Sequence, residues 1–242
     1  MFEFCCAGEK REASTVAAAS TRSSPEQEQA SSEIKFVMHL DGTMPPMPMI
    51  KMNADRKCLA MHKEPVYSQR VIINGSGMLE NVFVYVKEGL GSRTFPAPKT
   101  PVVLEQHECM YEPHVLGIMT GQPLEIINRD PVLHNIHALP KTNRPFNVAQ
   151  PRQGMSTVKS FSHVEVMVPV KCEVHSWMNA YIGVLDHPFF AVSDSDGACE
   201  IKGLPPGSYL ISAWHEKFGF QAHSVTLASG ETKNVEFRFS SH

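Results

Sequence analysis

The chain has 242 residues, of which 42% are hydrophobic and 19% charged, so it can bury the core of one large domain or two small ones. Its formal net charge of −3, without basic runs, excludes the electrostatic pattern of a nucleic-acid-binding protein. No stretch approaches the roughly 20 apolar residues of a membrane span. The 18 prolines and 15 glycines occur at short intervals, which favours an all-β protein of short strands and turns.

The N-terminal quarter of the chain is predicted to lack a packed core. Residues 1–33 are rich in Ser, Ala, Glu and Gln, which predicts a disordered leader. Residues 34–66 are predicted to be extended, because the prolines between residues 44 and 49 stiffen the backbone. This segment carries thioethers that suit Cu(I), although methionines of such a strap also serve simply to pack against a core. They are Met44, Met47, Met49 and Met52.

Folded structure is predicted to begin near Tyr67. Two apolar runs, 71–73 and 82–86, flank an Asn-Gly turn signal and predict a hairpin. Further strands are predicted at 115–119, 124–127, 164–170 and 181–185. In the run from 164 to 170 four valines alternate on one face, and Cys172 continues that parity. The pattern therefore predicts an inward-pointing thiol at a strand end.

The residues around this thiol have the chemistry of a metal site. Cys172, His175 and Met178 offer a thiolate, an imidazole and a thioether within seven residues, and His134 follows an earlier strand. Two imidazoles, one thiolate and a weak thioether form a recognised copper site. His137, three residues after His134, is a competing ligand.

Zinc is the chemical alternative for the same residues. A Cys-His-His set with an open position suits catalytic zinc, and Glu173 or Asp130 would then be the carboxylate base. No phosphate-binding loop or nucleophile elbow accompanies the site, so the sequence does not indicate a nucleotide enzyme or a serine hydrolase.

From about Tyr111 to Leu185 the chain resembles the cupredoxins, the plastocyanin and azurin family. In that family a His-Asn pair after a strand and a Cys…His…Met loop before the last strand hold copper. The resemblance implies a Greek-key β-sandwich with one copper ion per chain. It implies His134, Cys172, His175 and Met178 as ligands, with the edge of His175 as the exit for the electron. Only two residues separate His175 from Met178, fewer than in plastocyanin, which leaves the axial role of Met178 open.

The C-terminal segment, residues 189–242, resembles the second half of the carboxypeptidase regulatory-like, or transthyretin-like, β-sandwich. The resemblance rests on Asp196-Gly197, the Gly-Leu-Pro-Pro-Gly run that ends at Gly207, and the Val-x-Phe ending. It implies a second small sandwich. Residues 67–188 are predicted to form the cupredoxin-like domain, with the alternative that residues 67–90 pair with 189–240 and the copper domain is inserted between them.

Cys58 and Cys109 each open a similar short segment and would be paired by a disulfide in an oxidising compartment; two unrelated buried thiols are the alternative. We expect a periplasmic or extracellular protein whose leader is absent or truncated in this sequence. The expected function is single-electron transfer to a redox protein, without catalysis. A Cu(I) carrier that uses the site and the methionine segment is the alternative, and a structural β-protein is a third hypothesis.

Overall fold

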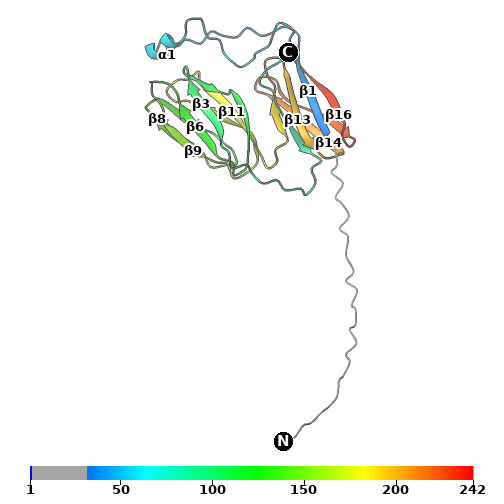
Figure 1. Ribbon diagram of the computed structural model, residues 1–242. Helices are drawn as coiled ribbons and strands as arrows, with labels where there is room; N and C mark the ends of the chain where they lie inside the picture. Colours follow the sequence, from blue (N-terminus) through cyan, green and yellow to red (C-terminus); the bar gives the residue numbers. More distant parts are fainter. Residues whose placement is uncertain (2–31, 242) are drawn as a thin grey trace.

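The computed structural model describes Met1 and residues 32–241, and nearly all of its regular structure is strand, arranged in four sheets (Figure 1). The predicted all-β class is therefore confirmed. The leader predicted for residues 1–33 lies outside the described residues apart from Met1 and its last two positions, which already belong to strand β1 (Ser32–Asp41). Among the described residues, no helix is long and apolar enough to cross a membrane.

One β-sandwich holds the segment expected to bind metal. Its strands are β3 (Val102–His107), β4 (Met110–Glu112), β5 (Val115–Met119), β6 (Leu124–Asn128), β7 (His134–Ala138), β8 (Phe146–Gln150), β9 (Ser156–Lys159), β10 (Glu165–Lys171) and β11 (Asn179–Leu185). They form two sheets, with the orders β5-β11-β10-β7-β8 and β4-β3-β6-β9. The pairs β3–β6 and β5–β11 are parallel, so strands distant in sequence lie side by side, as in a Greek key.

The second sandwich draws on both ends of the described chain. Besides β1 it contains β2 (Phe83–Glu88), β12 (Phe190–Val192), β13 (Ala198–Leu204), β14 (Gly207–His215), β15 (Gly219–Leu227) and β16 (Thr232–Ser240). Its sheets have the orders β13-β1-β16 and β12-β2-β14-β15. β2 pairs with β14, with Val84 opposite Ala213, so residues 83–88 share a sheet with the C-terminal segment. The transthyretin-like resemblance of this sandwich stays a prediction.

The prediction that folded structure begins near Tyr67 is wrong, because β1 lies between β13 and β16. Its apolar residues alternate with period two, and four of them are buried in the second core: Ile34, Phe36, Met38 and Leu40. The prolines that indicated an extended segment lie only after residue 44, so they say nothing about residues 32–41. β15 was also missed, since most of its side chains are exposed and polar.

Two further strand predictions need correction. The hairpin around Asn74 shrinks to a single bridge between Ile73 and Leu79, because the Asn74 side chain accepts hydrogen bonds from the amides of Ser76 and Met78 and closes the turn locally. The valine parity before Cys172 is broken by an irregularity in β10 between residues 165 and 168, where Met167 has a φ of 64°. Val164 is accordingly exposed, although the residues nearest Cys172 keep the predicted inward face.

After β1 the chain runs as a strap, residues 42–66, from the second sandwich to the first, and carries the short helix α1 (Arg56–Met61) (Figure 1). Asp55 is the N-cap of α1 and accepts hydrogen bonds from the amides of Lys57 and Cys58. Met47 packs against the second core and Met52 is buried in the first, whereas Met44 and Met49 are 39% and 52% exposed. Half of the methionine segment therefore serves packing.

The two sandwiches meet where aromatic rings lie on glycines. Phe83 of β2 is fully buried, and a Cβ added to Gly183 would lie 2.3 Å from its ring. Phe190 occupies the corresponding space over Gly117. Glycine at these two positions lets the aromatic side chains approach the backbone of the first sandwich.

We expect Gly183→Ala to lower the free energy of unfolding by about 1–3 kcal/mol, because the added methyl overlaps the Phe83 ring and Met167. The measurement is denaturant unfolding followed by circular dichroism. Gly75→Ala is the control, since a Cβ at Gly75 meets no atom within 4 Å. Equal losses for the two variants would contradict this account of the junction.

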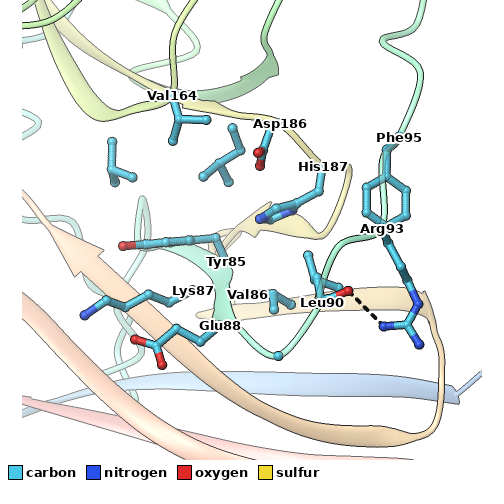
Figure 2. Close-up of a pocket in the computed structure, with 14 residues that line it drawn as sticks. Tyr85, Val86, Lys87, Glu88, Leu90, Arg93, Phe95, Val164, Asp186 and His187 are labelled. Atoms are coloured by element: carbon cyan, nitrogen blue, oxygen red, sulfur yellow. Dashed lines mark hydrogen bonds between the residues drawn. The ribbon is translucent and has the colours of Figure 1, made fainter.

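A pocket of about 530 Å³ also lies at the junction (Figure 2). Its walls include Tyr85 of β2 together with Val164, Asp186 and His187. Burial lowers the pKa of His187, so its imidazole is neutral near pH 7. The lining residues do not include the candidate metal ligands of the first sandwich, so the pocket is a separate feature.

Candidate metal centre

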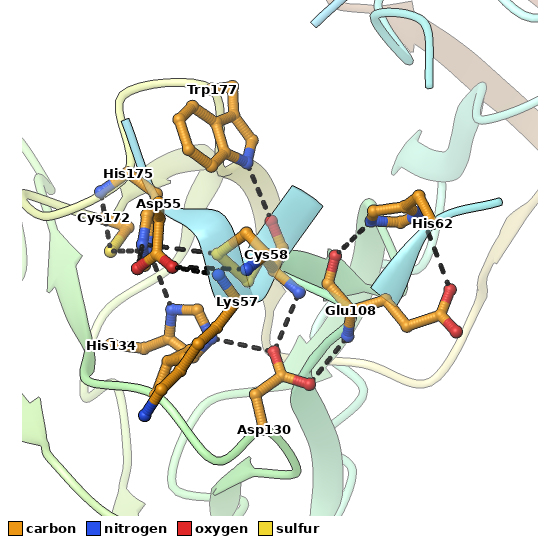
Figure 3. Close-up of a disulfide and its surroundings, with 12 residues drawn as sticks. Asp55, Lys57, Cys58, His62, Glu108, Asp130, His134, Cys172, His175 and Trp177 are labelled. Carbon is orange, nitrogen blue, oxygen red and sulfur yellow. Dashed lines mark hydrogen bonds and ion pairs between the residues drawn. A yellow bond between two sulfur atoms is a disulfide. The ribbon is translucent and has the colours of Figure 1, made fainter. Parts of the chain in front are cut away.

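The structure brings together His134, Cys172 and His175, the last two from the loop between β10 and β11 and the first from the start of β7 (Figure 3). His134 opens β7, Cys172 follows β10, and His175 lies in the loop before β11. All three are buried, and their ligand atoms lie within 4.8 Å of one another. The two Nδ1 atoms are 3.0 Å apart, and Cys172 Sγ is 3.9 Å from Nδ1 of His175.

Asn135 ties the two ligand-bearing segments together. Its side-chain oxygen accepts a hydrogen bond from the Glu173 amide at 2.6 Å and lies 3.3 Å from Cys172 Sγ. Its carbonyl accepts a hydrogen bond from the Tyr111 hydroxyl at 2.5 Å. The Cys172 amide donates to the carbonyl of Met178, which closes the loop into a turn. Hydrogen bonds within the protein therefore hold the backbone around the candidate ligands.

Two carboxylates set the orientation of the imidazoles. His134 Nε2 is 2.8 Å from Asp130, and His175 Nε2 is 3.2 Å from Asp55. Although burial alone would raise the pKa of Asp130, hydrogen bonds from His134 and two backbone amides lower it, and a hydrogen bond from His175 likewise helps to lower the pKa of Asp55. Ionised carboxylates only accept hydrogen bonds, so each Nε2 carries the proton and donates.

The consequence is that both Nδ1 atoms present lone pairs to each other beside a sulfur. Two lone pairs at 3.0 Å repel unless a proton or a cation lies between them. Imidazoles held by carboxylates at their outer nitrogens are the usual arrangement of metal-binding histidines. Two imidazoles and one cysteine sulfur suit a soft or borderline ion, so the residues present fit copper.

The remaining candidates lie in different surroundings. His137 is three residues after His134 on the same strand and so faces the other side, where its Nδ1 pairs with Glu173 at 2.5 Å. Glu173 also pairs with Lys171, and Asp130 already accepts three hydrogen bonds. Glu173 and Asp130, the two possible bases of a catalytic zinc site, thus already have ion-pair or hydrogen-bond partners. Met178 is fully buried in the first core and stays a proposed ligand.

The centre is covered by the segment that contains α1, residues 55–62, here called the α1 cover. Cys58 of this segment forms a disulfide with Cys109 of the β3–β4 turn, the pair singled out in the sequence. Cys58 Sγ lies 3.5 Å from His175 Nε2, and Trp177 Nε1 donates to the carbonyl of Cys109 at 3.0 Å (Figure 3). The expectation of an exposed His175 edge is wrong, since His175 is 2% exposed.

Comparisons with known proteins give weak structural similarity to copper proteins. A Cu-containing nitrite reductase from Thermus scotoductus SA-01 aligns with a TM-score of 0.32 at 20% identity, over 41% of this chain and 25% of that one. A purple cupredoxin from Nitrosopumilus maritimus gives 0.30 at 20% identity, over 34% and 97%. An oxidised amicyanin variant gives 0.32 at 17% identity, over 42% and 97%. Each alignment covers less than half of this chain.

No protein family matches the sequence, and no curated protein does either. The chain spans a quarter of the length of the nitrite reductase.

The surroundings of Cys172 favour its thiolate form. Burial alone would raise its pKa, but the neighbouring imidazoles of His134 and His175 and nearby backbone groups lower the pKa of Cys172 from 9.0 to about 5. Hydrogen bonds and charges from Asp130 and Cys172 also outweigh burial and raise the pKa of His134.

We expect the ultraviolet absorbance of the Cys172 thiolate in the metal-free protein to persist down to about pH 5. The interactions that lower this pKa also contribute to the free energy of unfolding. Their contribution is complete above the pKa of the unfolded thiol and is lost as the pH falls through about 5. The difference spectrum between wild type and Cys172→Ser isolates this thiol from the others. A midpoint near the ordinary value of 9.0 would contradict the assignment.

Proposed function

We propose that this protein is an exported copper protein that transfers single electrons through one copper ion held by His134, Cys172 and His175, with Met178 as axial ligand. The observation that supports it best is the pair of facing Nδ1 atoms, 3.0 Å apart, beside a thiol whose pKa is lowered to about 5. Copper bound there supplies a one-electron Cu(I)/Cu(II) couple.

The protein residues have separate tasks in this proposal. Asp130 and Asp55 hold the outer nitrogens of the two histidines, which keeps both inner nitrogens aimed at the site. Asn135 and the Cys172–Met178 backbone bond hold the loops in one geometry, so little rearrangement accompanies a change of charge. The α1 cover and Trp177 exclude water, and a redox protein is the proposed partner.

The proposed location is the periplasm or the cell exterior. The Cys58–Cys109 disulfide supports it, because disulfides persist in oxidising compartments and are rare in the cytosol of most organisms.

The test is a titration of the metal-free protein with Cu(II), followed by visible and electron-paramagnetic spectra. An intense thiolate-to-copper band that saturates at one copper per chain, with a reversible potential, is the expected result. Tight binding of Zn(II) or Cu(I) without any such band would contradict electron transfer as the function.

A copper carrier is the second candidate, favoured by the burial of His175. An electron carrier benefits from a ligand edge at the surface, whereas the α1 cover closes that edge and suits an ion that is stored and released. A carrier is expected to bind Cu(I) far more tightly than Cu(II). The Cu(II) titration gives the affinity for Cu(II), and the reduction potential then gives the affinity for Cu(I). Comparable affinities for the two ions would exclude the copper carrier.

We expect Met178→Leu to keep the visible band and shift the reduction potential, since a weak axial thioether tunes the ion without contributing its colour. Leucine fills nearly the same volume in the first core, so folding is retained. Voltammetry of the two proteins measures the shift. An unchanged potential would remove Met178 from the ligand set.

A further inference from the structure

The outward nitrogen of His175 faces a second group of potential ligands. Cys58 Sγ is 3.5 Å from His175 Nε2, whereas His175 Nδ1 faces His134 on the other side of the ring. The ligand atoms of Cys58, Cys109 and His175 lie within 4.8 Å of one another, and all three residues are buried. Asp55 Oδ2 is 3.2 Å from the same nitrogen. Two sulfurs, an imidazole and a carboxylate therefore converge under the α1 cover.

We propose that reduction of the Cys58–Cys109 disulfide creates a second site, for one soft or borderline metal ion. Its ligands are the two thiolates and His175 Nε2, with Asp55 placed to be the fourth. The thiolate, not the disulfide, is a good ligand, so the site exists only in the reduced protein. Two thiolates with an imidazole suit Cu(I), Zn(II) or Cd(II). This proposal does not depend on electron transfer at the first centre.

Both sites use His175, through different nitrogens. In the first centre its Nε2 carries the proton and Nδ1 binds, as the contact with Asp55 requires. In the second site Nε2 binds and the proton moves to Nδ1, which then donates to His134 Nδ1 at 3.0 Å. An ion at one site therefore weakens binding at the other, and reduction of the disulfide shifts an ion toward the α1 cover.

A water-soluble phosphine can serve as the reductant of the Cys58–Cys109 disulfide. One phosphine and one water convert the disulfide to two thiols and one phosphine oxide, and the thiols release two protons when they bind a divalent ion. Both sulfurs are buried, so the reductant needs a local opening of the α1 cover. α1 is only six residues long and its Leu59 is 50% exposed, which makes such an opening small in extent.

The test uses Cd(II), a redox-inert soft ion, and the full chain with Cys172→Ser, which removes the thiolate of the first centre. We expect the phosphine-reduced protein to bind one Cd(II) per chain with the ultraviolet absorption of a cadmium–thiolate bond. The oxidised protein is expected to bind at least about tenfold more weakly and without that absorption. Equal binding by the two forms overturns the proposal.

Two reduced variants in the same background serve as controls. Cys58→Ser also lacks the disulfide and keeps every other thiol, so it is matched to the reduced protein and is expected to lose the absorption. His175→Gln keeps both thiols and is expected to weaken binding at least about tenfold. Unchanged affinity in His175→Gln overturns the ligand set. The same unchanged affinity is expected if reduction only unfolds the α1 cover and leaves two thiols that chelate the ion without His175. Circular dichroism reports the fold in each case.

Discussion

Cys172→Ala is expected to abolish the intense visible absorption of the Cu(II)-loaded protein. This absorption requires a thiolate bound to copper, and Cys172 is the thiol whose sulfur lies beside both Nδ1 atoms. His134 and His175 remain, so the variant still binds Cu(II), more weakly and as a colourless site of nitrogen and oxygen ligands. Visible spectra at saturating copper measure the loss, and electron-paramagnetic spectra show the change of ligands.

Cys199→Ala is the matched control for that experiment. Cys199 is the other free thiol in the described part of the chain, and it lies in β13 of the second sandwich. Burial raises its pKa to about 12, so it is a neutral thiol under all ordinary conditions. The control is expected to keep the absorption in full. A coloured Cys172→Ala protein would mean that another thiol binds the copper.

Removing the disulfide by Cys58→Ser and Cys109→Ser is expected to lower the free energy of unfolding by about 4 kcal/mol. The two cysteines are 51 residues apart, and their cross-link removes the corresponding loop-closure entropy from the unfolded chain. The variant also frees the α1 cover, so we expect an external chelator to remove copper faster. Denaturant unfolding of the metal-free proteins measures the first effect, and the decay of the visible band measures the second.

Leu59→Lys is the control for the effect of the cross-link, because it changes another residue of the α1 cover and keeps the disulfide. Leu59 lies in the same helix but is 50% exposed, and lysine has a similar helix propensity. The free energy of unfolding of the Leu59→Lys variant is therefore expected to stay within about 0.5 kcal/mol of wild type. If the double serine variant were as stable as this control, the cross-link would not contribute to the free energy of unfolding, which would contradict the prediction.

Most of the candidate ligands could be predicted from the sequence because they lie close together in the chain. Cys172, His175 and Met178 lie within seven residues, and the alternation of valines placed the thiol inward. His134 came from a resemblance to a known family, not from spacing. The structure brings His134, Cys172 and His175 together, while Met178 as a ligand and the identity of the bound ion stay proposals.

The surroundings of the site were not accessible in the same way. Asp130 was considered only as a base for zinc, whereas it holds His134 Nε2. Asp55 and the α1 cover were missed, because a proline-rich segment gives no local signal for packing against a loop more than 100 residues away. Sequence patterns report which face of a strand is buried, but not which distant segment buries it.

The position of β1 has a consequence for the order of folding. β1 pairs with β16, so Glu33 lies opposite Thr232, and one sheet of the second sandwich needs both ends of the described chain. The strands of the first sandwich all lie within residues 102–185. Since long-range pairing is slow and domains fold as units during synthesis, the first sandwich is expected to form before β1 can pair with its neighbours. Newly made chains would then expose an unpaired β1, which is the segment where a chaperone would bind or where misassembly would begin.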